Sequence, residues 1–251
     1  MFFRKNETNE TICPKRLSWK LILSAIFLTG ALLRIVSLWQ NPVMSRDAIV
    51  YVQCAESFPS SEGAAPPFPV MLILLLRLLH GAGFSWEMAG WLINLTAGML
   101  LIPVAYGIVL RIWNDRKWAL LAALFTAVHP SLIKLSIVIQ RDSLYLLFFW
   151  GCVYFLFCLL TSGRWPSAVA AGILTGCAVM TRFEGLELFF LWVVMAGFIW
   201  KKYGVKQMLF LVAVMVLPCL LILAAGWCLP SPWDLGSIWT RRFLFLQKTG
   251  L

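Results

Sequence analysis

Three widely separated stretches of this chain place a carboxylate close to an arginine between apolar runs. The pairs are Arg46-Asp47, Arg141-Asp142 and Arg182 with Glu184. A carboxylate can act as a general base on a hydroxyl group, and the planar guanidinium of arginine can bind two phosphate oxygens at once. If the fold brings these pairs together, they could remove a proton from an acceptor while holding a phosphate leaving group.

A sugar attached to a lipid phosphate is the donor that suits such a set. Its phosphate departs as an anion and needs no general acid, whereas a glycosidase needs two carboxylates because its alkoxide leaving group must be protonated. Asp47 is the candidate base, and Arg182, Arg141 and Lys134 are the candidate phosphate-binding residues. The chemistry requires no cofactor or metal ion, because arginine can neutralise a single phosphate; a divalent ion is left open.

The candidate base stands in the longest polar interruption of the apolar runs, residues 41–69. Ser45 can cap a helix whose first turn would hold Arg46 and Asp47. Apolar residues then recur at helical spacing, which is typical of an amphipathic helix lying at a membrane surface. The prolines of Pro66-Pro67-Phe68-Pro69 open the next segment in extended geometry.

The composition is that of a polytopic membrane protein. Of 251 residues, 61% are apolar, and the mean hydropathy is +0.84, against about 45–50% apolar residues in a soluble domain. The net charge of +10 is explained by lysine and arginine in cytoplasmic loops, so we expect no nucleic-acid partner. The seven cysteines show no metal-binding spacing.

The apolar runs predict an all-α fold with about seven transmembrane helices. They cover residues 17–39, 86–110, 118–133, 144–160, 168–180, 186–200 and 208–227. Residues 69–79 are too short to cross and are expected to dip into the membrane and stay on one side, as the partner of the amphipathic helix. Residues 1–16 and the turns 111–117, 162–166 and 201–206 hold more than half of the 21 lysines and arginines. They are therefore predicted to be cytoplasmic, and the acid–arginine pairs exoplasmic.

The residues that carry a family resemblance are Asp47 on the helix after the first span, the Pro-Pro-Phe-Pro run, Arg141-Asp142 and Thr181-Arg182-Phe183-Glu184-Gly185. Over residues 17–200 the chain resembles the N-terminal half of membrane glycosyltransferases with the GT-C fold, closest to bacterial relatives of protein O-mannosyltransferases and lipid A aminoarabinose transferases. The resemblance implies that Asp47 is the catalytic aspartate, Asp142 a second acidic residue and Arg182 the arginine near the exoplasmic end of a later span.

Two departures from the family pattern are visible. Many members have Asp-Glu where this chain has Asp47-Ala48, so a supporting acid is missing unless Glu56 supplies it. Members usually continue for further spans, so we expect this chain to correspond to the N-terminal part of a longer module. The expected organisation is a cytoplasmic segment 1–16, a transmembrane glycosyltransferase domain 17–228 and an exoplasmic tail 229–251.

The function expected from the resemblance is transfer of a sugar, with inversion, from a polyprenyl-phosphate donor to an exoplasmic acceptor. The acceptor would be a cell-envelope glycan, a lipid or a protein, and the protein would lie in the plasma (inner) membrane. Asp142, Glu184 and Glu56 are expected to support the site.

Two other readings of the whole chain stay open. One is a transporter or flippase for a lipid-linked sugar, and the other is a truncated, non-catalytic membrane subunit. The candidate residues also have simpler explanations: Asp47 could cap its helix, Arg182 could reach lipid phosphates, and Arg141-Asp142 could be a surface pair.

Overall fold

The computed structural model describes residues 18–40, 44–57 and 70–228. The predicted segments 1–16, 66–69 and 229–251 lie outside the described residues. The described part is all helical. Its elements are α1 (Trp19–Gln40), α2 (Arg46–Ser57), α3 (Met71–Gly81), α4 (Trp86–Trp113), α5 (Arg116–Val128), α6 (Pro130–Ile137), α7 (Arg141–Ser162), α8 (Trp165–Thr181), the 3₁₀ turn η1 (Phe183–Leu186), α9 (Glu187–Tyr203) and α10 (Val205–Cys228).

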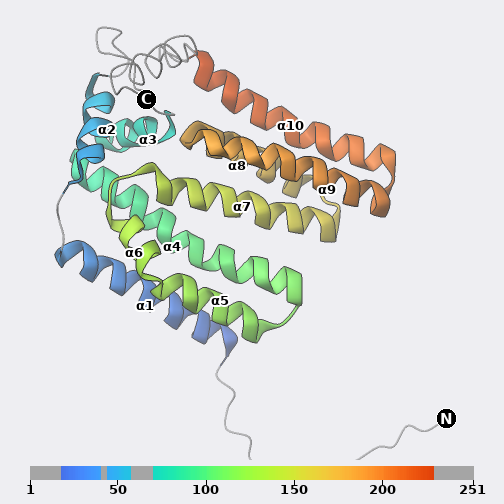
Figure 1. The fold of residues 1–251 in the computed structure, drawn as a ribbon, viewed down its shortest axis with the longest axis horizontal. Helices are drawn as coiled ribbons and strands as arrows, with labels where there is room; N and C mark the ends of the chain where they lie inside the picture. The colour runs from blue at the N-terminus through green and yellow to red at the C-terminus, as the bar shows by residue number, and fades with distance from the viewer. Residues whose placement is uncertain (1–17, 41–43, 58–69, 229–251) are drawn as a thin grey trace, which may run out of the picture.

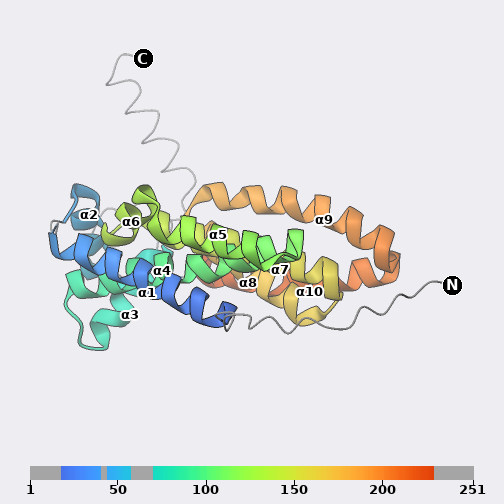
Figure 2. The same ribbon diagram turned by 90° about the horizontal axis from the view of Figure 1, so that it is seen from below.

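The long helices form a bundle, and the short ones gather at one of its ends. In Figure 1, α2, α3 and α6 lie where α1, α8 and α10 end and where α4, α7 and α9 begin. Figure 2, the view from below, shows the turn between α9 and α10 at the end opposite α2 and α3. We call the end that holds α2 and α3 the α2 end. The opposite end, where the turns 111–117, 162–166 and 201–206 lie, is called the basic end. The predicted acid–arginine pairs all fall at the α2 end.

Among the described residues, five helices are long and apolar enough to cross a membrane: α1, α4, α7, α9 with η1, and α10. This confirms the predicted all-α, polytopic membrane fold. The bent pair α5–α6 would make a sixth span. Helix α8 has 17 residues, about 26 Å of helix, and would be the seventh span of the predicted topology.

The predicted continuous span over residues 118–133 is wrong in detail. The chain bends by 53° between α5 and α6, and residues up to Ile137 are helical where a returning loop was expected. Pro130 causes the break, because it lacks an N–H group and its ring clashes with the carbonyl four residues earlier. The residue before it, His129, takes the extended conformation that a following proline favours.

Close packing of small residues holds the second half of the bundle together. Helix α8 packs against α7 and α10. A Cβ atom on Gly172 would overlap the backbone carbonyl oxygen of Met215 in α10, so only glycine allows the two backbones to approach this closely. Membrane helices commonly associate through small residues in this way, because lipid provides no hydrophobic driving force between helices.

The predicted interfacial helix pair is present as α2 and α3. Ala48, Tyr51 and Ala55 are the buried residues of α2. Tyr51 and Ala55 share a core cluster with residues of α3 and α4. Arg77 of α3 also donates a hydrogen bond to the carbonyl oxygen of Ala55, at 3.0 Å. This packing fixes α2 on the end of the bundle and sets the direction in which its polar side chains point.

Candidate active site

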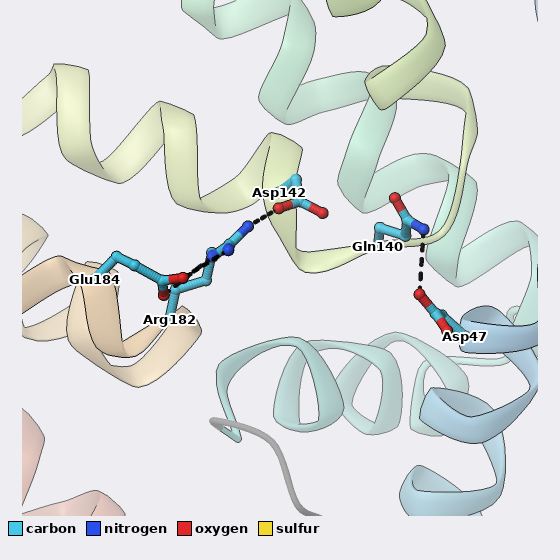
Figure 3. Close-up of polar contacts among 5 residues, drawn as sticks. All are labelled: Asp47, Gln140, Asp142, Arg182 and Glu184. Carbon is cyan, nitrogen blue, oxygen red and sulfur yellow. Dashed lines mark hydrogen bonds and ion pairs between the residues drawn. The ribbon is translucent and has the colours of Figure 1, made fainter. Parts of the chain in front are cut away.

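The start of α2 places Asp47 toward the segment that leads into α7. The backbone N–H of Ala48 donates to the Ser45 hydroxyl at 3.1 Å, which confirms Ser45 as the helix cap. Asp47 is exposed in the first turn. Its Oδ2 accepts a hydrogen bond from Nε2 of Gln140 at 3.4 Å (Figure 3). A residue 93 positions away therefore touches the candidate base.

Arg182 is the centre of a second group of charges, which we name the Arg182 cluster and define as Arg182, Asp142 and Glu184. Arg182 follows the last residue of α8 in extended conformation. Its Nη2 and Nε atoms contact the two carboxylate oxygens of Glu184 at 2.7 and 3.2 Å. Its Nη1 pairs with Asp142 at the start of α7 (Figure 3). The cluster thus joins α7, α8 and η1.

The carboxylates of Glu184 and Asp142 both stabilise the positive charge of the Arg182 guanidinium. The hydrogen bonds that Arg182 donates to Glu184 raise the pKa of Arg182, and the charge of Asp142 adds to the effect. These contacts use three of the five N–H groups of the side chain, which leaves two that carry no hydrogen bond to another described residue. The Tyr145 ring lies 5.6 Å from the guanidinium carbon, which closes one side of the group.

Tyr51 connects the two groups of charges. Its side chain is buried on the inner face of α2, and burial raises the pKa of its phenol. Arg141, Asp47, Asp142 and Arg182 all lie near enough to shift the same pKa by their charges, the arginines lowering it and the acids raising it. Asp47 and the Arg182 cluster therefore both lie within electrostatic reach of the same phenol, at the α2 end of the bundle.

A family comparison agrees with this geometry. Residues 83–233 match the family model described as dolichyl-phosphate-mannose-protein mannosyltransferase. The chain belongs to this family. None of the curated proteins matches the chain. Membership in this mannosyltransferase family confirms the predicted resemblance, and it supports a multi-pass membrane glycosyltransferase that uses a lipid-linked sugar.

The family match covers part of the charged site. It includes α4 to α10 and thus Asp142, Arg182 and Glu184, whereas Asp47 and the whole of α2 precede it. The family match therefore says nothing about Asp47 directly. What links Asp47 to the matched region is its contact with Gln140, which lies inside that region.

Two predicted site residues are not brought to the cluster. Glu56 is nine residues after Asp47 in the same helix, which is two and a half turns and places it on the opposite face of α2. It therefore does not stand in for the acid that Ala48 replaces. Lys134 is exposed on α6 and makes none of the cluster contacts described above. Arg141 opens α7 and is half-buried, within electrostatic reach of Tyr51.

Sequence reasoning missed three residues that matter here. Gln140 was part of the predicted loop but was given no role, although it precedes the acid–arginine pair directly. Tyr51 stands four residues after Asp47. Its spacing from Ala48 and Ala55, three and four residues, could have indicated that it is buried on the same face of the helix. Arg34 lies inside an apolar span and is wholly buried. Placing an arginine at the centre of a membrane helix costs about 2.5–3.5 kcal/mol on insertion scales, so such residues are commonly functional.

No group of three metal-ligating side chains is found within residues 18–40, 44–57 and 70–228. The site described above holds one base candidate, the Arg182 cluster with its two carboxylates, a second arginine and a phenol. Such a set can bind an anionic oxygen and accept a proton.

Proposed function

We propose that this protein transfers a sugar from a polyprenyl-phosphate donor to an acceptor on the exoplasmic side of the plasma (inner) membrane. The observation that carries the proposal is the meeting of Asp47, Gln140 and the Arg182 cluster at one end of a membrane bundle. Gln140 contacts Asp47 from 93 positions away, and Asp142 pairs with Arg182 from 40 positions away, so the fold and not local sequence brings these residues together. The family match supplies the class of reaction.

The donor phosphate binds to the two free N–H groups of Arg182, with Arg141 as the second cation. Formal charges within the Arg182 cluster sum to −1, and Arg141 brings the sum to zero. Net attraction of the anion is therefore small, and the phosphate is recognised mainly through directed hydrogen bonds from a guanidinium that two carboxylates hold in place. Asp142 and Glu184 serve as the residues that orient Arg182.

The acceptor hydroxyl attacks the anomeric carbon of the sugar as the bond from that carbon to the phosphate oxygen breaks. The phosphate oxygen keeps the electron pair and leaves as polyprenyl phosphate. The hydroxyl proton passes to the Asp47 carboxylate, which the Gln140 amide holds in place. Because the attack comes from the face opposite the leaving phosphate, the configuration at the anomeric carbon inverts.

The arrangement of charges argues for exoplasmic chemistry. The basic end carries the cytoplasmic turns predicted from the lysine and arginine distribution, and the charged site lies at the other end of the bundle. A lipid phosphate at the bilayer surface would reach this site without crossing the membrane.

A transfer assay tests the proposal. The full chain, reconstituted in liposomes, is given a polyprenyl-phosphate donor with a radiolabelled sugar and a cell-envelope extract as acceptor. We expect the label to leave the lipid fraction while polyprenyl phosphate accumulates. If the donor instead crosses the bilayer with its sugar still attached, the protein is a flippase and the proposal fails; it also fails if the label stays on the donor with every acceptor fraction.

A further inference from the structure

Arg34 is the most deeply buried charged side chain of the first span. It lies six residues before the end of α1, about 9 Å along the helix axis, and none of its surface is exposed. The buried residues of α1 are Ile26, Gly30 and Arg34, at intervals of four. They form the stripe of α1 that packs against α5 and α6.

The Arg34 guanidinium is held by oxygens of uncharged groups. Its Nη1 donates to the carbonyl oxygens of Ala127 and Gly30, both at 3.0 Å, and Nη2 donates to that of Thr126 at 3.4 Å. Its Nε donates to the Ser136 hydroxyl at 3.1 Å. One side chain of α1 therefore contacts the last turn of α5 and the second turn of α6.

These contacts repair the break between α5 and α6. In an unbroken helix the Thr126 carbonyl would accept from the N–H of residue 130, but that residue is Pro130 and has no N–H. A carbonyl at membrane depth needs a donor, and Nη2 of Arg34 provides it. The contact from Nε to Ser136 then fixes α6 relative to the end of α5.

The segment after α6 leads directly to the site. Ser136 lies against Gly98 of α4, where a Cβ atom would overlap the Ser136 hydroxyl. Ile139 lies against Gly90, where a Cβ atom would come within 2.6 Å of its Cδ1. The next residue is Gln140, which contacts Asp47. Residues 136–140 are thus held by α1 and α4 in the place from which Gln140 reaches α2.

We propose that Arg34 is a positioning residue for the site. It sets the angle between α5 and α6, and so the place of Gln140 beside Asp47, without touching substrate itself. An effect of Arg34 on sugar transfer rests on the proposed function. Its effect on the angle between α5 and α6, and on the place of Gln140, does not. The Arg34 hydrogen bonds go to α5, α6 and α1's own Gly30, and not to the Arg182 cluster, which is built on α7, α8 and η1.

Amide hydrogen exchange of the full chain, measured without donor, tests this role. In Arg34→Met we expect residues 130–140 and the first turn of α2 to exchange about tenfold faster, while α8, α9 and α10 are unchanged. Ser136→Ala removes the acceptor of Arg34 Nε together with the hydroxyl's own hydrogen bond to the Leu132 carbonyl within α6. The other Arg34 contacts stay in place, so the substitution should accelerate the same residues by a smaller factor. Arg34→Lys keeps the charge but loses the fork, so it should resemble Arg34→Met. Arg111→Met, which removes an arginine at the basic end, is the matched control and should leave residues 130–140 unchanged.

Unchanged exchange at residues 130–140 in both Arg34→Met and Ser136→Ala would overturn the proposal. Uniform acceleration of every helix in both variants would also overturn it, because Arg34 would then only stabilise the fold. If Arg34→Met loosens the whole chain, Ser136→Ala decides: local acceleration supports the positioning role and no change overturns it. If Arg34→Lys exchanges like the unsubstituted chain, the positive charge alone is enough, and the claim that the planar fork of Arg34 is needed is wrong.

A kinetic measurement separates this proposal from the proposed function. In an active preparation, Ser136→Ala should lower the turnover number by a larger factor than it changes the half-saturating donor concentration, because Arg182, the main ligand of the donor phosphate, does not contact Ser136 or Arg34. A change confined to donor affinity would contradict the positioning role. Absence of transfer by the unsubstituted chain would count against the proposed function and leave the exchange result standing.

Discussion

At the α2 end of the bundle Arg182 contacts two carboxylates from different elements, whereas at the basic end Arg111 donates to the hydroxyl of Thr161 at 2.8 Å. Arg116 of the basic end lies over the Trp19 ring at 5.3 Å, and Lys202 donates to the carbonyl of Leu160 at 2.6 Å. These are contacts of cations that anchor a helix end at a membrane interface. The same residue types thus serve as anchors at one end and as parts of a charged site at the other.

The acids differ between the two ends in the same way. Asp115 at the basic end accepts from the backbone N–H of Lys117 at 2.8 Å and caps α5. Asp47 at the α2 end leaves the capping to Ser45 and contacts a side chain from another helix. Burial and charge alone do not distinguish these acids; what distinguishes them is whether the partner is local or distant in sequence.

The largest expected effect is that of Asp47→Asn. Asparagine keeps the size and the contact to Gln140 but cannot accept the acceptor proton, so turnover should fall by about 10²–10⁴-fold. Donor binding should change little, because the Arg182 cluster is untouched. Asp115→Asn is the matched control, since asparagine caps a helix as well as aspartate, and it should keep full turnover. Equal losses in the two variants, measured as initial transfer rates, would remove the distinction between the two ends.

Arg182→Ala should have the next largest effect. It removes the charge-assisted contacts to the donor phosphate, worth about 1.5–3 kcal/mol, so the half-saturating donor concentration should rise by about tenfold or more. Arg182→Lys should recover part of this, because a single ammonium lacks the two-pronged geometry. Arg111→Ala at the basic end should bind donor normally. Titration with a fluorescent polyprenyl-phosphate sugar measures all three, and normal binding by Arg182→Ala would reduce Arg182 to a lipid anchor.

A smaller effect of opposite sign is expected for Asp142→Asn. The substitution removes one negative charge beside the phosphate site while keeping an oxygen that can accept from Arg182, so donor should bind about two- to fivefold more tightly. Glu184→Gln should act in the same direction. The same titration checks both variants; weaker binding in both would mean that orientation of Arg182 outweighs the electrostatic repulsion.

The smallest effect is expected for Gln140→Ala. Its contact with Asp47 is long, at 3.4 Å, and exposed, so its loss should lower turnover only about two- to fivefold, within the usual range for one hydrogen bond. Donor affinity should be unaffected. A loss comparable to that of Asp47→Asn would show that Gln140 does more than hold the carboxylate.

Local patterns predicted the elements that carry the site. The cap at Ser45, the apolar spacing of α2 and the apolar runs each depend on a few neighbouring residues, and the structure confirms them. The gathering of acid–arginine pairs at one end followed from counting spans, since an odd or even number of crossings fixes the side of each loop.

The pairing of distant residues could not be predicted in this way. Nothing in the sequence around Arg182 shows that Asp142 contacts it, because that contact depends on the packing of α7 against α8. Glu56 was expected near Asp47, but its helical phase places it on the opposite face. Residues 118–133 were predicted as one continuous span, and Arg34, the donor that permits the bend at Pro130, is supplied by another helix.

Photocrosslinking of the donor tests most directly that the charged site at the α2 end, and not the basic end, binds the lipid phosphate. A polyprenyl phosphate with a diazirine next to the phosphate group would be bound to the full chain, irradiated, and its attachment sites mapped by mass spectrometry. The account predicts attachment within residues 140–145 and 182–187, reduced in Arg182→Ala. Attachment concentrated in residues 111–118 or 201–206 would contradict it.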